Sequence, residues 1–204
     1  MSAVPPLSDR AKQLIPKARI VSFARWEGDL PPEAIARLQA ADDAGRFLDD
    51  DDLEAIFDLS QGANWQNLER QSLLLAGRLR DTAAEIVAEA REQVLESFPG
   101  ITEPGGGLHP KFRADACWRD FWHFLRCITY GTVGDRDDYL SQDGLHHMNL
   151  LYCELRVPLP AMIFGIQMLQ QSATDRCSTE YEQSSLTRCA RPLREALLAF
   201  KEGL

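Results

Sequence analysis

The chain of 204 residues has no apolar run that approaches the roughly 20 residues of a membrane-spanning helix. Residues 1–10 also lack the charged and then apolar pattern of a secretory signal. Both absences predict a protein that does not insert into a membrane and that is cytoplasmic.

Basic residues are in short supply, because 22 Lys and Arg stand against 31 Asp and Glu, which gives a net charge of −9. Nucleic-acid binding depends on a concentrated basic face that contacts phosphates, and anionic membrane surfaces repel an acidic protein. The composition therefore disfavours both nucleic acid and membrane surfaces as partners.

Signatures of metal binding and catalysis are missing as well. The five cysteines include no C-x-x-C pair, so the sequence predicts neither a disulfide framework nor a structural zinc site. His146 and His147 are adjacent, so on a helix they point about 100° apart and do not face one metal together. No set of nucleophile, base and orienting group stands out. We therefore expect a protein that is not an enzyme and holds no metal.

What the sequence does contain is helical periodicity, and strand-like alternation of useful length is lacking. We expect one all-α domain at residues 31–204, preceded by a loosely helical N-terminal arm at residues 1–30. The acidic run Asp49–Asp52 is typical of a helix N-terminus, where acids match the helix dipole. The expected helices span residues 31–44, a segment after Asp52, 64–98 with one allowed break, 110–131, 136–154, 159–172 and 178–201.

The most informative segment is residues 116–131, where a thiol, guanidinium groups and a carboxylate stand beside aromatic residues. On a helix Arg113, Cys117, Asp120 and Phe124 fall near one stripe. A thiol adds to a double bond as thiolate, which neighbouring Arg113 and Arg119 are expected to favour. This pattern suits covalent capture of a conjugated, acidic ligand.

The other residues of this segment have matching roles in that interpretation. Asp120 would accept hydrogen bonds from ring N–H groups and stabilise a cationic chromophore. The arginines would pair with ligand carboxylates, and Trp118, Phe121 and Phe124 would hold flat rings. The competing interpretation is that Cys117 is a small core residue and that the charges face water.

Two linked motifs in this segment carry a family resemblance. The letters A-C-W-R-D at 116–120 and L-R-C-I-T-Y-G at 125–131 resemble A-C-x-R-D and L-R-x-x-T-Y-(A/G) of the phycobiliproteins, the globin-like bilin-carrying subunits of phycobilisomes. Residues 104–106 resemble the P-G-G of the preceding loop, and residues 41–48 resemble A-D-x-x-G-R-(F/Y)-L. The similarity covers residues 31–173. It implies a globin-like phycobiliprotein bundle.

The resemblance also implies roles for single residues. Cys117 would attach a phycocyanobilin-type linear tetrapyrrole as a thioether, and Asp120 would bind its inner pyrrole nitrogens. Arg119 and Arg113 would contact its propionates or rings, and Tyr152 belongs to a segment that resembles Y-x-x-L-G-x-P.

The chain also departs from the family pattern at several positions. The family often has a basic residue where this chain has Phe112, and Lys111 lies one position earlier. Arg156 replaces the glycine of Y-x-x-L-G-x-P. The propionate contacts are therefore less firmly implied than the thioether.

The resemblance further implies partners. In the family, the acid of the A-D-x-x-G-R corner meets the arginine of the partner's L-R motif. This chain has both groups, Asp42 and Arg126, so it carries both halves of a reciprocal pair. Self-association through them, or assembly with phycobiliprotein subunits, is expected; the alternative is that both charges face water.

Two functions remain open at this point. The first is a bilin-binding phycobiliprotein in light absorption, energy transfer or light sensing, which phycobilisomes would bring to the thylakoid surface. The second is a regulator of antenna assembly or degradation that binds bilin weakly or not at all. The unmatched N-terminal arm and Phe112 motivate the second.

Overall fold

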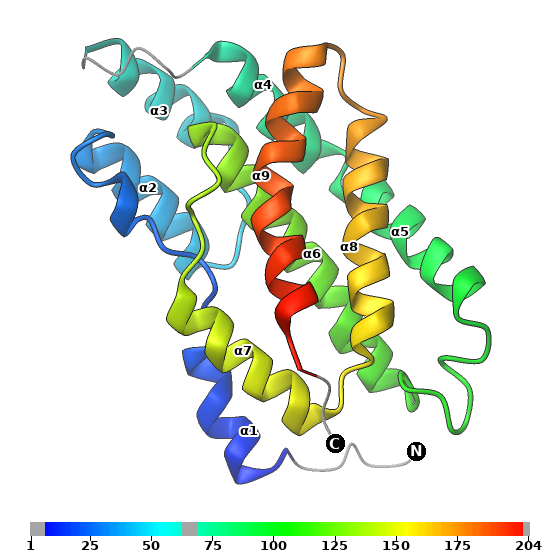
Figure 1. The fold of residues 1–204 in the computed structure, drawn as a ribbon. Helices are drawn as coiled ribbons and strands as arrows, with labels where there is room; N and C mark the ends of the chain where they lie inside the picture. Colours follow the sequence, from blue (N-terminus) through cyan, green and yellow to red (C-terminus); the bar gives the residue numbers. More distant parts are fainter. Residues whose placement is uncertain (1–6, 63–68, 202–204) are drawn as a thin grey trace.

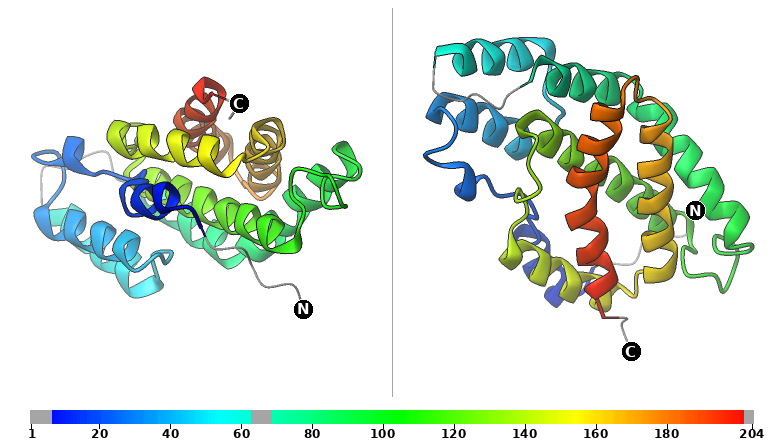
Figure 2. Two further views of the ribbon diagram at one scale, coloured as in Figure 1. Left: turned by 90° about the horizontal axis from the view of Figure 1, so that it is seen from below. Right: turned by 45° about the horizontal axis from the view of Figure 1, so that its top comes forward.

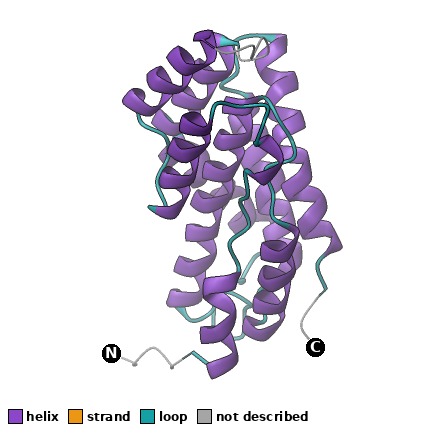
Figure 3. Ribbon diagram, turned by 90° about the vertical axis from the view of Figure 1, so that its left-hand side faces the viewer, coloured by secondary structure: helices purple, strands orange, loops and turns teal. Residues whose placement is uncertain are grey.

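The computed structural model describes residues 7–62 and 69–201, and among these residues the regular secondary structure is helical (Figure 3). An all-α architecture was predicted and is confirmed. The helices are α1 (Asp9–Leu14), α2 (Pro32–Asp43), α3 (Asp50–Gly62), α4 (Arg70–Asp81), α5 (Ala83–Ser97), α6 (Lys111–Gly134), α7 (Gln142–Leu155), α8 (Leu159–Thr174) and α9 (Glu180–Ala199).

Most predicted helix boundaries agree with the structure to within a few residues. The helix expected at 64–98 is divided at Thr82 into α4 and α5, and its first residues, 64–68, lie outside the described part of the chain. The helix expected at 136–154 begins only at Gln142, because Ser141 caps it by accepting from the Gly144 N–H. Residues 136–140 instead form an irregular connection, with an isolated antiparallel bridge between Val21 and Leu140.

Helix α6 lies at the centre of the molecule and packs against α4, α5, α8 and α9 (Figure 1). Its apolar residues Phe121, Phe124, Leu125 and Ile128 are buried, which is why so long a helix is stable in the interior. Helices α8 and α9 lie side by side over it, and the α2–α3 pair lies at the opposite side from α5 (Figures 1 and 2).

Residues 7–30 of the N-terminal arm include α1, a 3₁₀ turn at Ala24–Trp26, and a 3₁₀ turn at Ile15–Lys17, where Pro16 ends the α-helix. The chain then runs extended beside the α6–α7 connection, with Ser22 donating to the Tyr139 carbonyl. Trp26 is fully buried against Gly134, where a Cβ would lie 2.6 Å from the indole ring. The arm is therefore packed into the main core.

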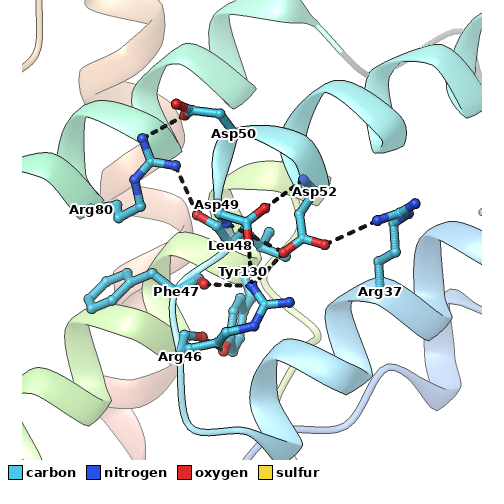
Figure 4. A network of polar contacts seen from close by, with 9 residues as sticks. All are labelled: Arg37, Arg46, Phe47, Leu48, Asp49, Asp50, Asp52, Arg80 and Tyr130. Carbon is cyan, nitrogen blue, oxygen red and sulfur yellow. Dashed lines mark hydrogen bonds and ion pairs between the residues drawn. The ribbon is translucent and has the colours of Figure 1, made fainter.

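The acidic run acts as the predicted helix cap and also joins three helices at the corner before α3 (Figure 4). Asp49 accepts from the Asp52 N–H at 2.9 Å. Asp52 accepts from Arg46 at 2.5 Å and from Arg37 at 3.3 Å. Burial alone would raise the pKa of Asp52, but these hydrogen bonds lower it. Arg80 of α4 adds bonds of 2.7 Å to Asp50 and 3.1 Å to the carbonyl that precedes the run.

Candidate functional site

The candidate site is built on the first half of α6, which begins directly after Pro110 at Lys111. Proline suits this place because the first helical N–H groups have no partner in the helix. The side chain of Cys117 is buried, with 4% of the residue exposed, and Asp120 lies one turn further on the same side. The predicted stripe of Arg113, Cys117, Asp120 and Phe124 is therefore present, and it faces inward.

Asp120 is held by a residue from another helix. The Tyr152 hydroxyl of α7 donates to Asp120 Oδ2 at 2.7 Å. Burial raises the pKa of Asp120 to about 6, against the lowering effects of this hydrogen bond and of Arg119. The Tyr152 ring is in turn covered edge-on by Phe200, with ring centroids 5.8 Å apart. The site thus holds a half-buried carboxylate beside a thiol, which is an acceptor suited to buried N–H groups.

The thiol itself corrects one prediction. Arg113 and Arg119 were expected to favour the thiolate, but burial and neighbouring Asp120 raise the pKa of Cys117 to about 12. Arg113 lowers the pKa only in part, because its guanidinium is directed at backbone carbonyls. At neutral pH the sulfur is therefore a thiol, and the expectation of an activated thiolate was wrong for this state.

The predicted carboxylate-binding residues are mostly engaged within the chain. Arg113 donates to the carbonyls of Gly107 at 3.1 Å and Arg156 at 2.8 Å, which joins the loop before α6 to the end of α7. Lys111 Nζ lies 2.8 Å from both carboxylate oxygens of Asp115. Arg119 is exposed and has no side-chain hydrogen bond to any described residue.

The aromatic residues divide into two groups. Phe121 of α6 is fully buried against α8, where Gly165 leaves room for its ring; a Cβ on Gly165 would lie 2.0 Å from Phe121 Cζ. Trp118 packs edge-on against Phe121 at 5.5 Å and borders a cavity between α5, the loop before α6, and α6. Arg91 of α5 lies over the Trp118 ring. The sequence analysis did not identify Arg91 as a site residue, because Arg91 lies far from Trp118 along the chain and outside the motifs.

The predicted charge pair of Asp42 and Arg126 is made within one chain. Arg126 Nη2 lies 3.4 Å from Asp42 Oδ1, and Arg19 of the N-terminal arm donates to Asp42 Oδ2 at 3.0 Å. The Asp42 side chain is only 5% exposed. Both of its oxygens are thus already paired without a second subunit.

Comparison with known proteins decides the family. The family model described as phycobilisome protein matches residues 36–196. The chain belongs to the phycobilisome protein family. This phycobilisome protein has the globin-like all-α fold of phycobiliproteins, as its motifs predicted.

Several curated relatives agree with that assignment. This phycobilisome protein is 29% identical to allophycocyanin subunit alpha-B of Nostoc sp. over 69% of the chain and 83% of the relative. It is 28% identical to the allophycocyanin alpha chain of Thermosynechococcus vestitus, with the same coverage of 69% and 83%. It is 32% identical to allophycocyanin subunit beta-18 of Porphyra purpurea over 75% of the chain and 85% of that subunit.

Two features are absent from the described part of the chain. No described helix is long and apolar enough to cross a membrane. Among residues 7–62 and 69–201, no group of three or more His, Cys, Asp or Glu side chains is arranged to hold a metal ion. Membership of this family supports a pigment-binding, light-harvesting role rather than an enzymatic one.

Proposed function

We propose that this chain binds a linear tetrapyrrole of the phycocyanobilin type, attached as a thioether to Cys117. The single observation that carries the proposal is the hydrogen-bonded Tyr152–Asp120 pair one helical turn from that thiol, in a chain of the phycobilisome protein family. Its allophycocyanin relatives are consistent with such a pigment.

The donor set fits this group. A bilin supplies a conjugated ring system whose inner N–H groups need a buried acceptor, and Asp120 is positioned to be that acceptor. Tyr152 orients the carboxylate, and Trp118 offers a flat apolar surface. Addition of the Cys117 S–H across a carbon–carbon double bond forms one C–S and one C–H bond and needs no oxidant.

The burial of Cys117 has a consequence for attachment. With a pKa of about 12, few Cys117 thiols are ionised at neutral pH, and the residue is buried, with 4% of its surface exposed. Attachment therefore requires a local opening of the site. The loop before α6 has Gly100 and Gly105 at positive φ and is joined to the site by the hydrogen bond from Arg113 to the Gly107 carbonyl, so it is the segment that we propose opens.

Co-expression with a bilin biosynthetic pathway tests this function. The wild-type chain should give a coloured band that survives a denaturing gel, and Cys117→Ala should abolish it. Cys127→Ala is the matched control, because Cys127 is also a buried thiol on α6 but lies about two helical turns beyond Asp120. A covalent colour that persists in Cys117→Ala would contradict the thioether.

A second function is favoured by specific contacts. The buried thiol, the engagement of Arg113 with carbonyls, and the pairing of Asp42 with Arg19 all suit a family member that regulates antenna assembly or degradation with little or no bilin. A pull-down from cell extract separates the two. Recovery within intact antenna particles supports the pigment carrier, whereas binding to free subunits or a protease adaptor supports the regulator.

A further inference from the structure

A cavity of about 390 Å³ lies beside Cys117 on the flank of α6 that faces α5. Ala114 and Trp118, which precede and follow Cys117 on the helix, form one wall, and Leu95 of α5 contributes to the other. The polar groups at the cavity are Arg91, Thr102, His109, Lys111 and Asp115. It is a concave, partly apolar site with several converging polar groups, as ligand sites commonly are.

The charge of this cavity is opposite to that of the whole chain. Arg91 and Lys111 are cationic and Asp115 is the one acid of its lining, whereas the chain carries a net charge of −9. Lys111 and Asp115 neutralise each other through their 2.8 Å contacts. Arg91 has no hydrogen bond or ion pair to a described residue; its guanidinium lies 5.5 Å from the Trp118 ring centroid. Arg91 is therefore an available cation beside an aromatic wall.

The position of the cavity relative to Asp120 matters for a pigment on Cys117. At about 100° per residue, Ala114 and Trp118 lie on one flank of Cys117, whereas Asp120 lies on the other. A linear tetrapyrrole carries its inner nitrogens along one edge and its two propionate groups along the opposite edge. Nitrogens that face Asp120 therefore direct the carboxylates toward Trp118 and Arg91.

We infer that Arg91 binds a propionate of the ligand over the Trp118 ring, in place of Arg113, whose guanidinium is bound to the Gly107 and Arg156 carbonyls. This inference rests on the proposed function and adds to it a carboxylate subsite on α5. A guanidinium pairs with a carboxylate through two parallel hydrogen bonds and also stacks on an aromatic ring, so both contacts are compatible at one residue.

The test uses biliverdin and biliverdin dimethyl ester as probes, titrated by absorbance into full-length Cys117→Ser protein so that only reversible binding is measured. Arg91→Gln should weaken binding of biliverdin about tenfold, the usual scale for losing one charged pair, and should leave binding of the ester unchanged. Arg70→Gln is the matched control, because Arg70 is also exposed and lies over an aromatic ring, Phe57, at 4.9 Å but outside this cavity.

Equal affinity of Arg91→Gln and its parent for biliverdin overturns the inference, as does equal weakening for acid and ester. Failure of the parent to bind either probe overturns it too. The proposed function is judged separately, by covalent colour on wild-type Cys117. If the wild-type chain is coloured but Arg91→Gln does not change the affinity for biliverdin, the proposed pigment role stands and only the subsite at Arg91 is overturned.

Discussion

The Tyr152 hydroxyl and the Asp120 carboxylate are joined by a 2.7 Å hydrogen bond that links α7 to α6 beside the candidate attachment cysteine. The bond does not fully offset the cost of burying the carboxylate, since the pKa of Asp120 is still about 6. The carboxylate of Asp120 is therefore an acceptor for ring nitrogens in the proposed function. Its raised pKa also makes the stability of the fold depend on pH.

Asp120→Asn should stabilise the ligand-free protein at pH 8. The folded-state pKa of about 6 lies above the ordinary value of 3.8, so the ionised carboxylate destabilises the fold above pH 6, and protonation relieves this as the pH falls toward 4. We expect a gain in unfolding free energy of about 2–3 kcal/mol at pH 8 that shrinks toward pH 4. Urea unfolding at both pH values measures it, and a gain of equal size at pH 4 would contradict this cause.

His123 should have the opposite pH dependence. Burial, followed by the charge of Arg126, lowers the pKa of His123 to about 4 from 6.5. The unfolded chain therefore binds a proton that the folded chain does not, and stability falls as the pH drops from 6.5 to 4. His123→Gln keeps an acceptor for Arg126 but does not titrate. Its unfolding free energy should therefore fall by about 2–3 kcal/mol less than that of the wild-type chain over this pH range. The unfolding free energy of both proteins is measured from pH 7 to pH 4.5. A difference between the two proteins that stays constant over this range would rule out His123 as the cause.

Alkylation of Cys117 should be slow in the folded, ligand-free chain. Burial and the charge of Asp120 keep the sulfur protonated, with a pKa of about 12. Peptide mapping by mass spectrometry after iodoacetamide treatment at pH 8 should show Cys117 reacting at least about tenfold more slowly than in the urea-unfolded chain. Similar rates in the two states would mean that the thiol is open to solvent.

Gly165→Ala should destabilise the protein, because the added methyl would lie 2.0 Å from Phe121 Cζ in the packed interface of α6 and α8. Overpacking of this kind costs about 1–3 kcal/mol. Gly77→Ala is the control: it is also helical, but its nearest contact would be an ordinary 3.5 Å to Leu53 Cδ1, so we expect no loss. Thermal unfolding of both variants gives the comparison, and equal melting temperatures would show that the α6–α8 contact adapts freely.

Local sequence is enough to specify the helical architecture, because apolar spacing and capping residues act over one or two turns. It predicted the cap at Asp49–Asp52 and placed Cys117 one turn from Asp120 on a shared face, and the structure agrees. The linked motifs also indicated the family, which the match over residues 36–196 confirms. The roles of Cys117, Asp120 and Tyr152 in holding a pigment stay predictions.

The electrostatics of the site and the partners of its charges depend on the packing of the whole fold. The pKa of Cys117 depends on how deeply the packed fold buries it, and local sequence does not specify that burial. Arg113 donates to the Arg156 carbonyl at the end of α7, Arg91 of α5 lies over the Trp118 ring, and Arg19 of the arm pairs with Asp42. Each contact joins residues that are far apart in the chain. These residues come into contact only when the complete fold packs, because local sequence acts over one or two helical turns.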